Sequence, residues 1–208
     1  MVRPCQLVAL LLTLQGLILV VYGKFKGRGA RSGTEHDVGQ STPSEIRLIG
    51  LFAFEATSSV AKVALEDVNS NPIILPGVTL SMSYGDSKRN QSLATSLFLD
   101  EIRPVAPFPP KIGVVGEWSS RVCLSLTYVA SYYRIPQISY ACTSKNLSNL
   151  TNAFFLRGVP ADSEQAKALA DLVSYYSFAG SKVVTISTTD EYGTSFQTVS
   201  YPHSLEPD

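Results

Sequence analysis

Three short segments carry the side chains that could bind a ligand. Each comes just after a predicted β-strand: Gly116-Glu117-Trp118-Ser119-Ser120, Tyr140-Ala141-Cys142-Thr143-Ser144 and Thr188-Thr189-Asp190-Glu191-Tyr192-Gly193. Open α/β sheets bind their ligands outside the carboxyl ends of the strands. These segments are therefore the first candidates for a binding site.

The first segment could bind an anion. Ser119 or Ser120 begins a predicted helix, and a helix start offers unpaired backbone N–H groups and the positive end of the helix dipole. Together with a serine hydroxyl, these groups suit a carboxylate. The local pattern is equally compatible with Ser119 as a simple helix cap.

The other two segments, and one residue between them, offer further polar contacts. Thr143 and Ser144 could hold an amino or carboxylate group, or could form an ordinary polar turn. Asp162 could pair with an ammonium group, or could cap the helix expected to start near Ser163. Tyr192 could stack over a ligand or lie exposed in a loop.

Several other chemistries are not supported by the sequence. The formal net charge is +0, so no basic surplus indicates a nucleic-acid partner. No Gly-x-Gly-x-x-Gly or Gly-x-x-x-x-Gly-Lys motif follows a strand, which argues against a nucleotide cofactor. With only 2 His, no Cys-x-x-Cys spacing and no Gly-x-Ser-x-Gly, we expect no metal site and no enzyme.

Hydrophobic periodicity predicts an alternation of strands and helices. Apolar or alternating runs predict strands at 46–54, 78–84, 111–115, 135–140 and 182–187, and helical spacing predicts helices at 56–68, 87–102, 119–133 and 163–177. Such alternation is typical of βαβ units. We therefore expect the α/β class, with a parallel sheet and helices on both faces.

The N-terminal residues have the layout of a secretory signal. Arg3 precedes an apolar run of about 15 residues, shorter than the ~20 that span a bilayer, and small residues precede Lys24. We predict a signal peptide at 1–23, a flexible Gly- and Ser-rich leader at 24–44, and entry into the secretory pathway.

The cysteines and sequons fit that compartment. Cys123 and Cys142 could form a disulfide in an oxidising environment, provided that their Cα atoms lie within about 7 Å. Asn90, Asn146 and Asn149 each begin an Asn-X-Ser/Thr triplet and are candidate glycosylation sites. Asn146 and Asn149 are too close together for both to carry a glycan easily.

A set of ordered motifs resembles one known family. The motifs are Val114-Val115-Gly116-Glu117-Trp118-Ser119-Ser120-Arg121-Val122, Tyr133-Arg134-Ile135-Pro136-Gln137-Ile138-Ser139-Tyr140-Ala141-Cys142-Thr143-Ser144, Phe154-Phe155-Leu156-Arg157, Val159-Pro160-Ala161-Asp162 and Tyr192-Gly193. They resemble the receptor family ligand-binding region, the Venus-flytrap module of metabotropic glutamate, calcium-sensing, type B GABA and natriuretic-peptide receptors. The resemblance is strongest to the metabotropic glutamate and calcium-sensing branch.

The resemblance implies a two-lobed fold of the periplasmic-binding-protein type I class. Residues 45–156 would form an incomplete first lobe, and 157–193 would form a crossing segment and the start of the second lobe. Residues 194–208 look like a divergent tail that does not continue the expected helix, so we expect a fragment of a longer module. Homo- or heterodimers through the first lobe are also implied.

The resemblance further implies roles for single residues. Ser120 and Thr143 would hold the α-groups of an amino acid, Asp162 would meet its ammonium, and Tyr192 would close from the second lobe. Ala141 stands where glutamate-type members carry a hydroxyl and calcium-sensing types carry Ala. The ligand is therefore expected to be an α-amino acid whose side chain is undetermined.

Four functions follow from these observations. The first is a receptor ectodomain that senses an amino acid for G-protein-coupled signalling, at the extracellular face of the plasma membrane or in secreted form. The alternatives are a ligand-silent ectodomain that serves as a dimerisation partner, and a natriuretic-peptide or guanylyl-cyclase type of receptor ectodomain. A secreted α/β enzyme is disfavoured by the scarcity of His and the missing nucleophile motif.

Overall fold

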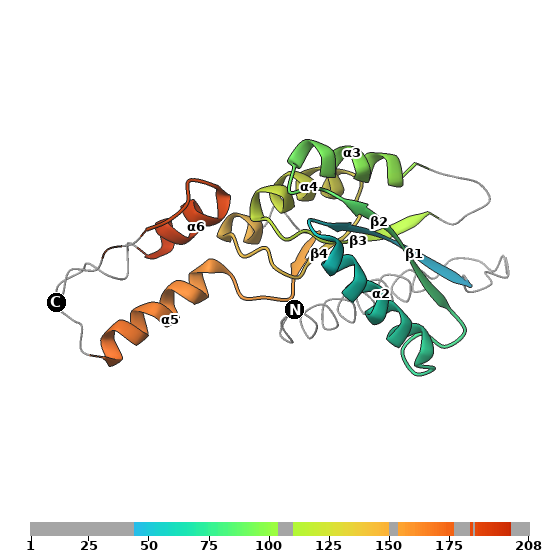
Figure 1. Ribbon diagram of the computed structural model, residues 1–208, viewed down its shortest axis with the longest axis horizontal. Helices are drawn as coiled ribbons and strands as arrows, with labels where there is room; N and C mark the ends of the chain where they lie inside the picture. Colours follow the sequence, from blue (N-terminus) through green and yellow to red (C-terminus); the bar gives the residue numbers. More distant parts are fainter. Residues whose placement is uncertain (1–43, 104–109, 150–153, 177–183, 185, 201–208) are drawn as a thin grey trace, which may run out of the picture.

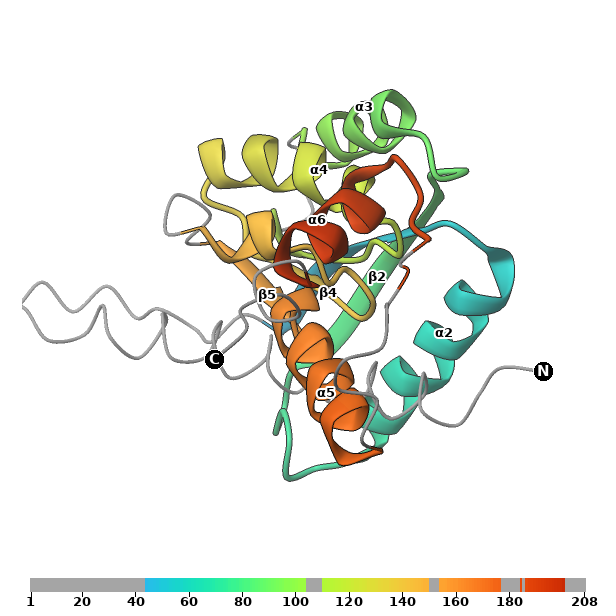
Figure 2. The same ribbon diagram turned by 90° about the vertical axis from the view of Figure 1, so that its left-hand side faces the viewer.

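A parallel sheet organises the part of the chain that the structure describes (Figures 1 and 2). The computed structural model describes residues 44–103, 110–149, 154–176, 184 and 186–200. The elements are β1 (Glu45–Phe52), α2 (Glu55–Ser70), β2 (Thr79–Asp86), α3 (Gln91–Glu101), β3 (Lys111–Val115), α4 (Ser120–Tyr132), β4 (Gln137–Ser139), the 3-10 helix η1 (Lys145–Ser148), β5 (Phe155–Arg157), α5 (Asp162–Tyr175) and α6 (Glu191–Ser200). The strand order is β2-β1-β3-β4-β5, with every pair parallel. The predicted α/β class and parallel sheet are confirmed.

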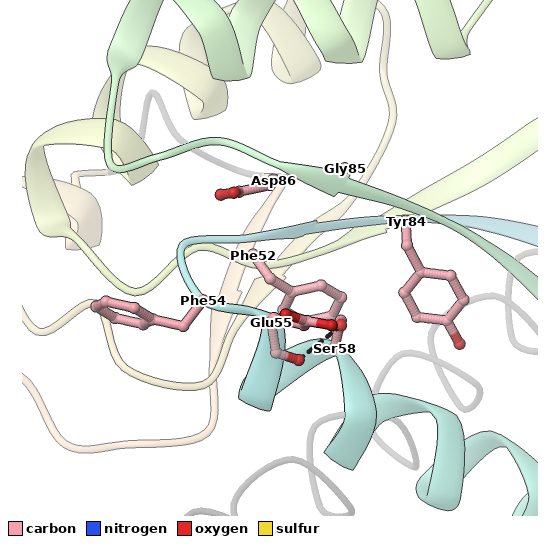
Figure 3. Close-up of a pocket in the computed structure, with 7 residues that line it drawn as sticks. All are labelled: Phe52, Phe54, Glu55, Ser58, Tyr84, Gly85 and Asp86. Atoms are coloured by element: carbon pink, nitrogen blue, oxygen red, sulfur yellow. Dashed lines mark hydrogen bonds between the residues drawn. The ribbon is translucent and has the colours of Figure 1, made fainter.

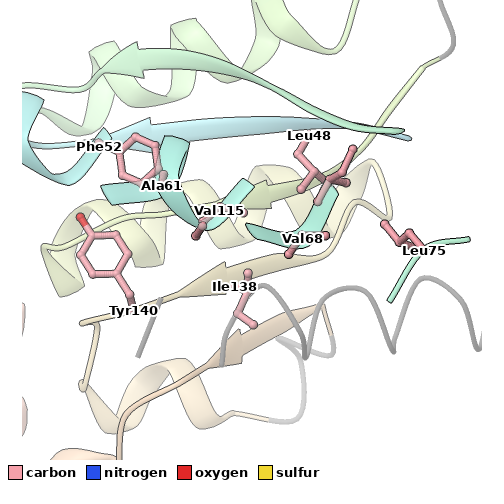
Figure 4. Close-up of a cluster of buried hydrophobic side chains, with 10 residues drawn as sticks. Leu48, Phe52, Ala61, Val68, Leu75, Val115, Ile138 and Tyr140 are labelled. Carbon is pink, nitrogen blue, oxygen red and sulfur yellow. The ribbon is translucent and has the colours of Figure 1, made fainter. Parts of the chain in front are cut away.

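The sheet buries apolar side chains on both faces. In β1, Leu48 and Phe52 point to the side of α2, whereas Ile49 and Leu51 point to the side of α3 and α4. Figure 4 shows the cluster on the α2 side, and Figure 1 shows α2 on one face of the sheet and α3 and α4 on the other. Because successive strand residues alternate between faces, a strand covered on both sides must be almost wholly apolar.

The turn before α3 starts that helix later than periodicity predicts. Helical spacing suggested a start at Ser87, but Lys88 and Arg89 adopt positive φ angles of 50° and 57°, which an α-helix does not contain. Asn90 then caps the helix, because its side-chain oxygen accepts a hydrogen bond from the N–H of Leu93 at 3.0 Å. The chain thus extends β2 to Asp86 before it turns.

Gly116 marks the exit from β3 toward the candidate site. Its φ is +137°, and a Cβ atom at this position would lie 2.0 Å from the carbonyl oxygen of Leu51 in the neighbouring strand β1. Only glycine fits this close approach of two backbones. It lets the chain pass close beside the end of β1 as it leaves β3.

Two predictions in the C-terminal part are wrong. Residues 182, 183 and 185 of the predicted buried strand lie outside the described residues, but Val184 and Ile186 are 82% and 98% exposed and belong to no strand. The helix that was expected to break off at Thr194 instead continues to Ser200 as α6. Its start is stabilised by Asp190, whose carboxylate accepts from the N–H of Gly193 at 3.1 Å.

Other predictions fall on residues that are not described. The predicted signal peptide and all but the last residue of the leader lie outside the described residues, as do residues 201–208 of the predicted tail. β5 was not predicted as a strand, and it extends the sheet beyond β4. Within the described ranges, no helix has both the length and the apolar character needed to cross a membrane.

Candidate ligand-binding site

A disulfide fastens the two main segments of the site together. Cys123 in the first turn of α4 is bonded to Cys142 after β4, with a Cα–Cα distance of 6.5 Å, within the reach that such a bridge requires. Both cysteines are fully buried and pack with Leu147. The bridge holds the loop that carries Thr143 against the helix that Ser120 begins.

A buried carboxylate lies directly before α4. Glu117 is 0% exposed, and its carboxylate accepts hydrogen bonds from the N–H groups of Trp118 at 2.9 Å and Ser119 at 3.4 Å. The hydroxyl of Ser87 donates to its other oxygen. Burial raises the pKa of Glu117, and the nearby charge of Asp86 raises it further, although these hydrogen bonds act against the shift. Glu117 thus occupies the backbone N–H groups of Trp118 and Ser119, which are not free to bind a ligand.

Other donors at the start of α4 remain available. In the described part of the chain, the N–H groups of Ser120, Arg121 and Val122 donate to no acceptor, and the side chain of Ser119 makes no capping bond. The hydroxyl oxygen of Ser120 accepts from the N–H of Ser144 at 3.3 Å, which ties the two segments together. Free N–H groups at the positive end of a helix favour an anion here.

Thr143 and Asp162 form a second polar group beside this helix start. The N–H of Asp162 donates to the carbonyl of Thr143 at 2.8 Å. Thr143 is 9% and Asp162 0% exposed, yet among the described residues neither the Thr143 hydroxyl nor either carboxylate oxygen of Asp162 has a hydrogen-bond partner. Asp162 is the first residue of α5, and its side chain makes no capping bond there. A buried carboxylate without partners is unfavourable unless another group pairs with it.

Arg157 lies near Asp162 but is engaged elsewhere. Its guanidinium donates to the carbonyls of Ser144 at 3.0 Å and Cys142 at 3.4 Å, and also to the hydroxyl of Ser148. Burial lowers the pKa of Arg157, while the charge of Asp162 acts in the opposite direction. The two charges influence each other without a direct ion pair in the described structure, so the buried oxygens of Asp162 have no charge partner among the described residues.

The helix α6 docks against the same loop. A carboxylate oxygen of Glu191 accepts from the hydroxyl of Ser144 at 2.7 Å and from the amide of Asn146 at 2.8 Å. The hydroxyl of Ser195 accepts from the N–H of Lys145 at 2.8 Å. Tyr192 lies in the first turn of this docked helix and is 45% exposed. The structure thus brings Tyr192 to the same side of the sheet as Thr143.

The remaining residues named from the sequence have simpler surroundings. Ala141 is partly buried, and its N–H donates to the hydroxyl of Ser139 at 3.2 Å. Among the candidate glycosylation sites, Asn90 uses its side-chain oxygen to cap α3, whereas Asn146 uses its amide nitrogen to contact Glu191. Asn149 is exposed. In the part of the chain that is described, no group of three or more His, Cys, Asp or Glu residues could hold a metal ion.

Sequence reasoning did not assign roles to three charged residues: Glu117, Arg157 and Glu191. Glu117 directly follows the strand β3, as predicted, whereas Glu191 stands in a segment that was predicted to follow a strand and does not. A charged residue at the end of a buried strand is a usable signal, because it must find a partner or shift its pKa. The signal cannot say which partner the residue finds.

The family match, together with the parallel α/β fold, identifies a ligand-binding region of a receptor. Residues 56–198 match the family described as receptor family ligand binding region. This is a family of receptor ligand-binding regions rather than of enzymes, and the chain belongs to it. The resemblance read from the motifs is therefore confirmed.

The relatives agree with this membership. The chain is 37% identical over 146 residues to the extracellular calcium-sensing receptors of Homo sapiens and Mus musculus, which is 62% of this chain and 13% of each receptor. It is 31% identical over 156 residues to Glutamate receptor 3.1 of Oryza sativa subsp. japonica, which is 73% of this chain and 16% of that protein. The chain thus spans a small part of the relatives that it matches.

Proposed function

We propose that this chain is the extracellular ligand-binding region of a receptor that senses an α-amino acid and signals through G proteins. The observation that carries the proposal is the carboxylate of Asp162, which is fully buried and has no hydrogen-bond partner among the described residues. It is linked through Thr143 and Ser144 to Ser120 at the start of α4. A cation acceptor and a set of anion donors thus lie on one side of the sheet.

The charges of a zwitterion would be divided between these groups. The ligand ammonium pairs with Asp162, and its carboxylate takes the free N–H groups at the start of α4 together with the hydroxyls of Ser119, Ser120 and Thr143. Ala141 borders the site, and Tyr192 closes over the ligand from α6. Both ligand charges must be paired, because burying an unpaired charge is strongly unfavourable.

The proposal extends to the architecture of the whole receptor. Residues 1–23 would be a signal peptide and 24–44 a leader, 45–156 would form the first lobe, and 157–193 would form the crossing and the start of the second lobe. Dimers would form through the first lobe, glycans would lie at Asn90, Asn146 or Asn149, and the domain would face the cell exterior. The names of the similar calcium-sensing and glutamate receptors support the proposal of an extracellular receptor domain.

Trp118 offers a direct test of binding. It is the single tryptophan of the sequence, it is 37% exposed, and it lies two residues before Ser120. Its fluorescence should change when each of the twenty amino acids is titrated into the protein, and calorimetry gives the affinity independently. Asp162→Asn should weaken binding by about 2–5 kcal/mol, as expected when one side of a buried charge pair is lost. Ser120→Ala should weaken it less, because the backbone donors remain.

The matched control is Asp171→Asn, which removes an exposed carboxylate from the same helix. This variant should bind like the parent protein. Unchanged affinity in Asp162→Asn, measured on a protein that does bind an amino acid, would mean that Asp162 does not contact the ammonium.

A further inference from the structure

A cavity opens at the carboxyl ends of β1 and β2. It has a volume of about 280 Å³ and includes the first turn of α2. Three aromatic rings (Phe52, Phe54 and Tyr84), two carboxylates (Glu55 and Asp86) and the hydroxyl of Ser58 line it. Figure 3 shows Glu55 and Ser58 next to the ring of Phe52, with Tyr84 directed to the same side and Asp86 extending from the end of β2. The described residues that line it include no Lys or Arg, although the ammonium of Lys62 lies over the ring of Tyr84.

The negative charges of the two carboxylates in this cavity are not neutralised by ion pairs among the described residues. Neither Glu55 nor Asp86 forms an ion pair within the described residues. Asp86 accepts one hydrogen bond, from the N–H of Lys88 at 2.8 Å. A third carboxylate, Glu117, lies close enough for the charge of Asp86 to raise its pKa. The local field at this edge of the sheet therefore favours a positive charge.

The aromatic rings of this region already attract cations. The ammonium of Lys62 lies 5.2 Å from the ring centre of Tyr84, and the guanidinium of Arg89 lies 4.8 Å from that of Trp118. Both distances are in the range of cation–π contacts. Aromatic rings combined with carboxylates are a common arrangement for binding organic ammonium or guanidinium groups.

The cavity is adjacent to the amino-acid site rather than remote from it. Its lining residue Phe54 packs edge-on against Trp118, with ring centres 5.7 Å apart. Trp118 is followed at once by Ser119 and Ser120, the proposed carboxylate site. Because β1 lies between β2 and β3 in the sheet, the ends of these strands form one continuous edge.

We propose that this cavity binds the cationic end of the ligand, so that the domain prefers α-amino acids with a positively charged side chain. The proposal rests on the amino-acid binding proposed above and specifies the ligand class. Glu55 and Asp86 supply the opposite charge, and the partly exposed rings of Phe54 and Tyr84 supply aromatic surface for an alkylammonium or guanidinium group. Arginine, lysine and ornithine have the required chemistry.

The test compares ligands of equal shape and different charge. L-arginine and L-citrulline are titrated while the fluorescence of Trp118 is followed. Arginine ends in a charged guanidinium group, whereas citrulline ends in a neutral ureido group of similar shape. Arginine should bind about tenfold more tightly, the effect expected of a few partly exposed charge and ring contacts. The preference should shrink at high ionic strength, because exposed charges are screened.

Variants assign the preference to the cavity. The double variant Glu55→Gln, Asp86→Asn keeps the shape of both side chains, and it should lose the preference for arginine while its affinity for citrulline stays the same. Asp100→Asn, which neutralises an exposed carboxylate on α3, is the control and should retain the preference. Thermal melts establish that the variants are folded, as expected for substitutions at exposed positions.

The possible failures can be told apart. Equal binding of arginine and citrulline by the parent protein, or a preference that survives in the double variant, overturns the cavity assignment and leaves amino-acid binding intact. If neither of them binds but another of the twenty amino acids does, the preference for a cationic side chain is overturned and the proposed function stands. If none of the twenty binds, the proposed function fails, and agmatine, which has the guanidinium but no carboxylate, tests the cavity alone. Agmatine binding that the double variant abolishes supports the cavity, and the absence of agmatine binding overturns it.

Discussion

Removing the disulfide between Cys123 and Cys142 should destabilise the domain and loosen the site. The bridge joins residues 19 apart, and closing a loop of this size restricts the unfolded chain enough to contribute about 3 kcal/mol to stability. Both cysteines are fully buried beside Leu147, so alanine at both positions leaves a small void that adds about 1 kcal/mol. We expect Cys123→Ala, Cys142→Ala to lose about 3–4 kcal/mol of unfolding free energy.

The same change should weaken ligand binding. The disulfide is one of few covalent or hydrogen-bonded ties between α4 and the loop that carries Thr143; another is the bond from the N–H of Ser144 to Ser120. Without the bridge, the hydroxyls of Ser120 and Thr143 are held less firmly in one geometry. Affinity should fall even where the variant remains folded.

Urea denaturation followed by circular dichroism measures the stability, with reduced parent protein as the second comparison. The reduced protein and the double variant should unfold at similar urea concentrations, both well below the oxidised protein. Alkylation of the unreduced protein should leave Cys123 and Cys142 unmodified. A double variant within about 0.5 kcal/mol of the parent, the range of a neutral surface change, would refute the reasoning, as would free thiols at these positions.

Two further predictions concern the exit from β3. Gly116→Ala should lower the unfolding free energy by more than about 3 kcal/mol, because it combines a strained backbone with a Cβ atom 2.0 Å from the carbonyl oxygen of Leu51. Gly77→Ala, at φ +74° in open space, should lower it by only about 1 kcal/mol. Chemical denaturation of both variants measures these losses, and equal losses would contradict the prediction. Glu117→Gln tests the buried carboxylate. Burial raises the pKa of Glu117 above its ordinary 4.5, so the folded state binds the proton more tightly than the unfolded state does. The stability of the parent relative to this variant should therefore fall as the pH rises above about 4.5 through the raised pKa. A relative stability that increases with pH would contradict the assignment.

Much of the first half of the fold could be predicted from local sequence. The strand predicted at 111–115 coincides with β3, and the helix predicted at 56–68 lies within α2. These elements are encoded by short apolar runs and by helical spacing, which are local properties. The later start of α3 was missed, because the positive φ angles of Lys88 and Arg89 carry no strong local signal.

The C-terminal part was harder to predict. The segment from Lys182 to Ser187 has the composition of a buried strand, but composition does not determine whether the rest of the chain covers the segment. Val184 and Ile186 are exposed in this structure. α6, in contrast, has a local cap at Asp190 that could have been recognised, since an Asp directly before a helical turn is a common start.

The sequence by itself determined the class of the sheet, the membership of the family and the polar segments that follow β3 and β4. It did so because hydrophobic periodicity and motif order are properties of neighbouring residues. Only the tertiary structure decided how those residues are used. Ser87 and Glu117 are 30 residues apart, and Ser144 and Glu191 are 47 apart, so their hydrogen bonds depend on how the chain crosses the sheet. The same holds for Asp162 at the start of α5, whose buried carboxylate has no hydrogen-bond partner among the described residues.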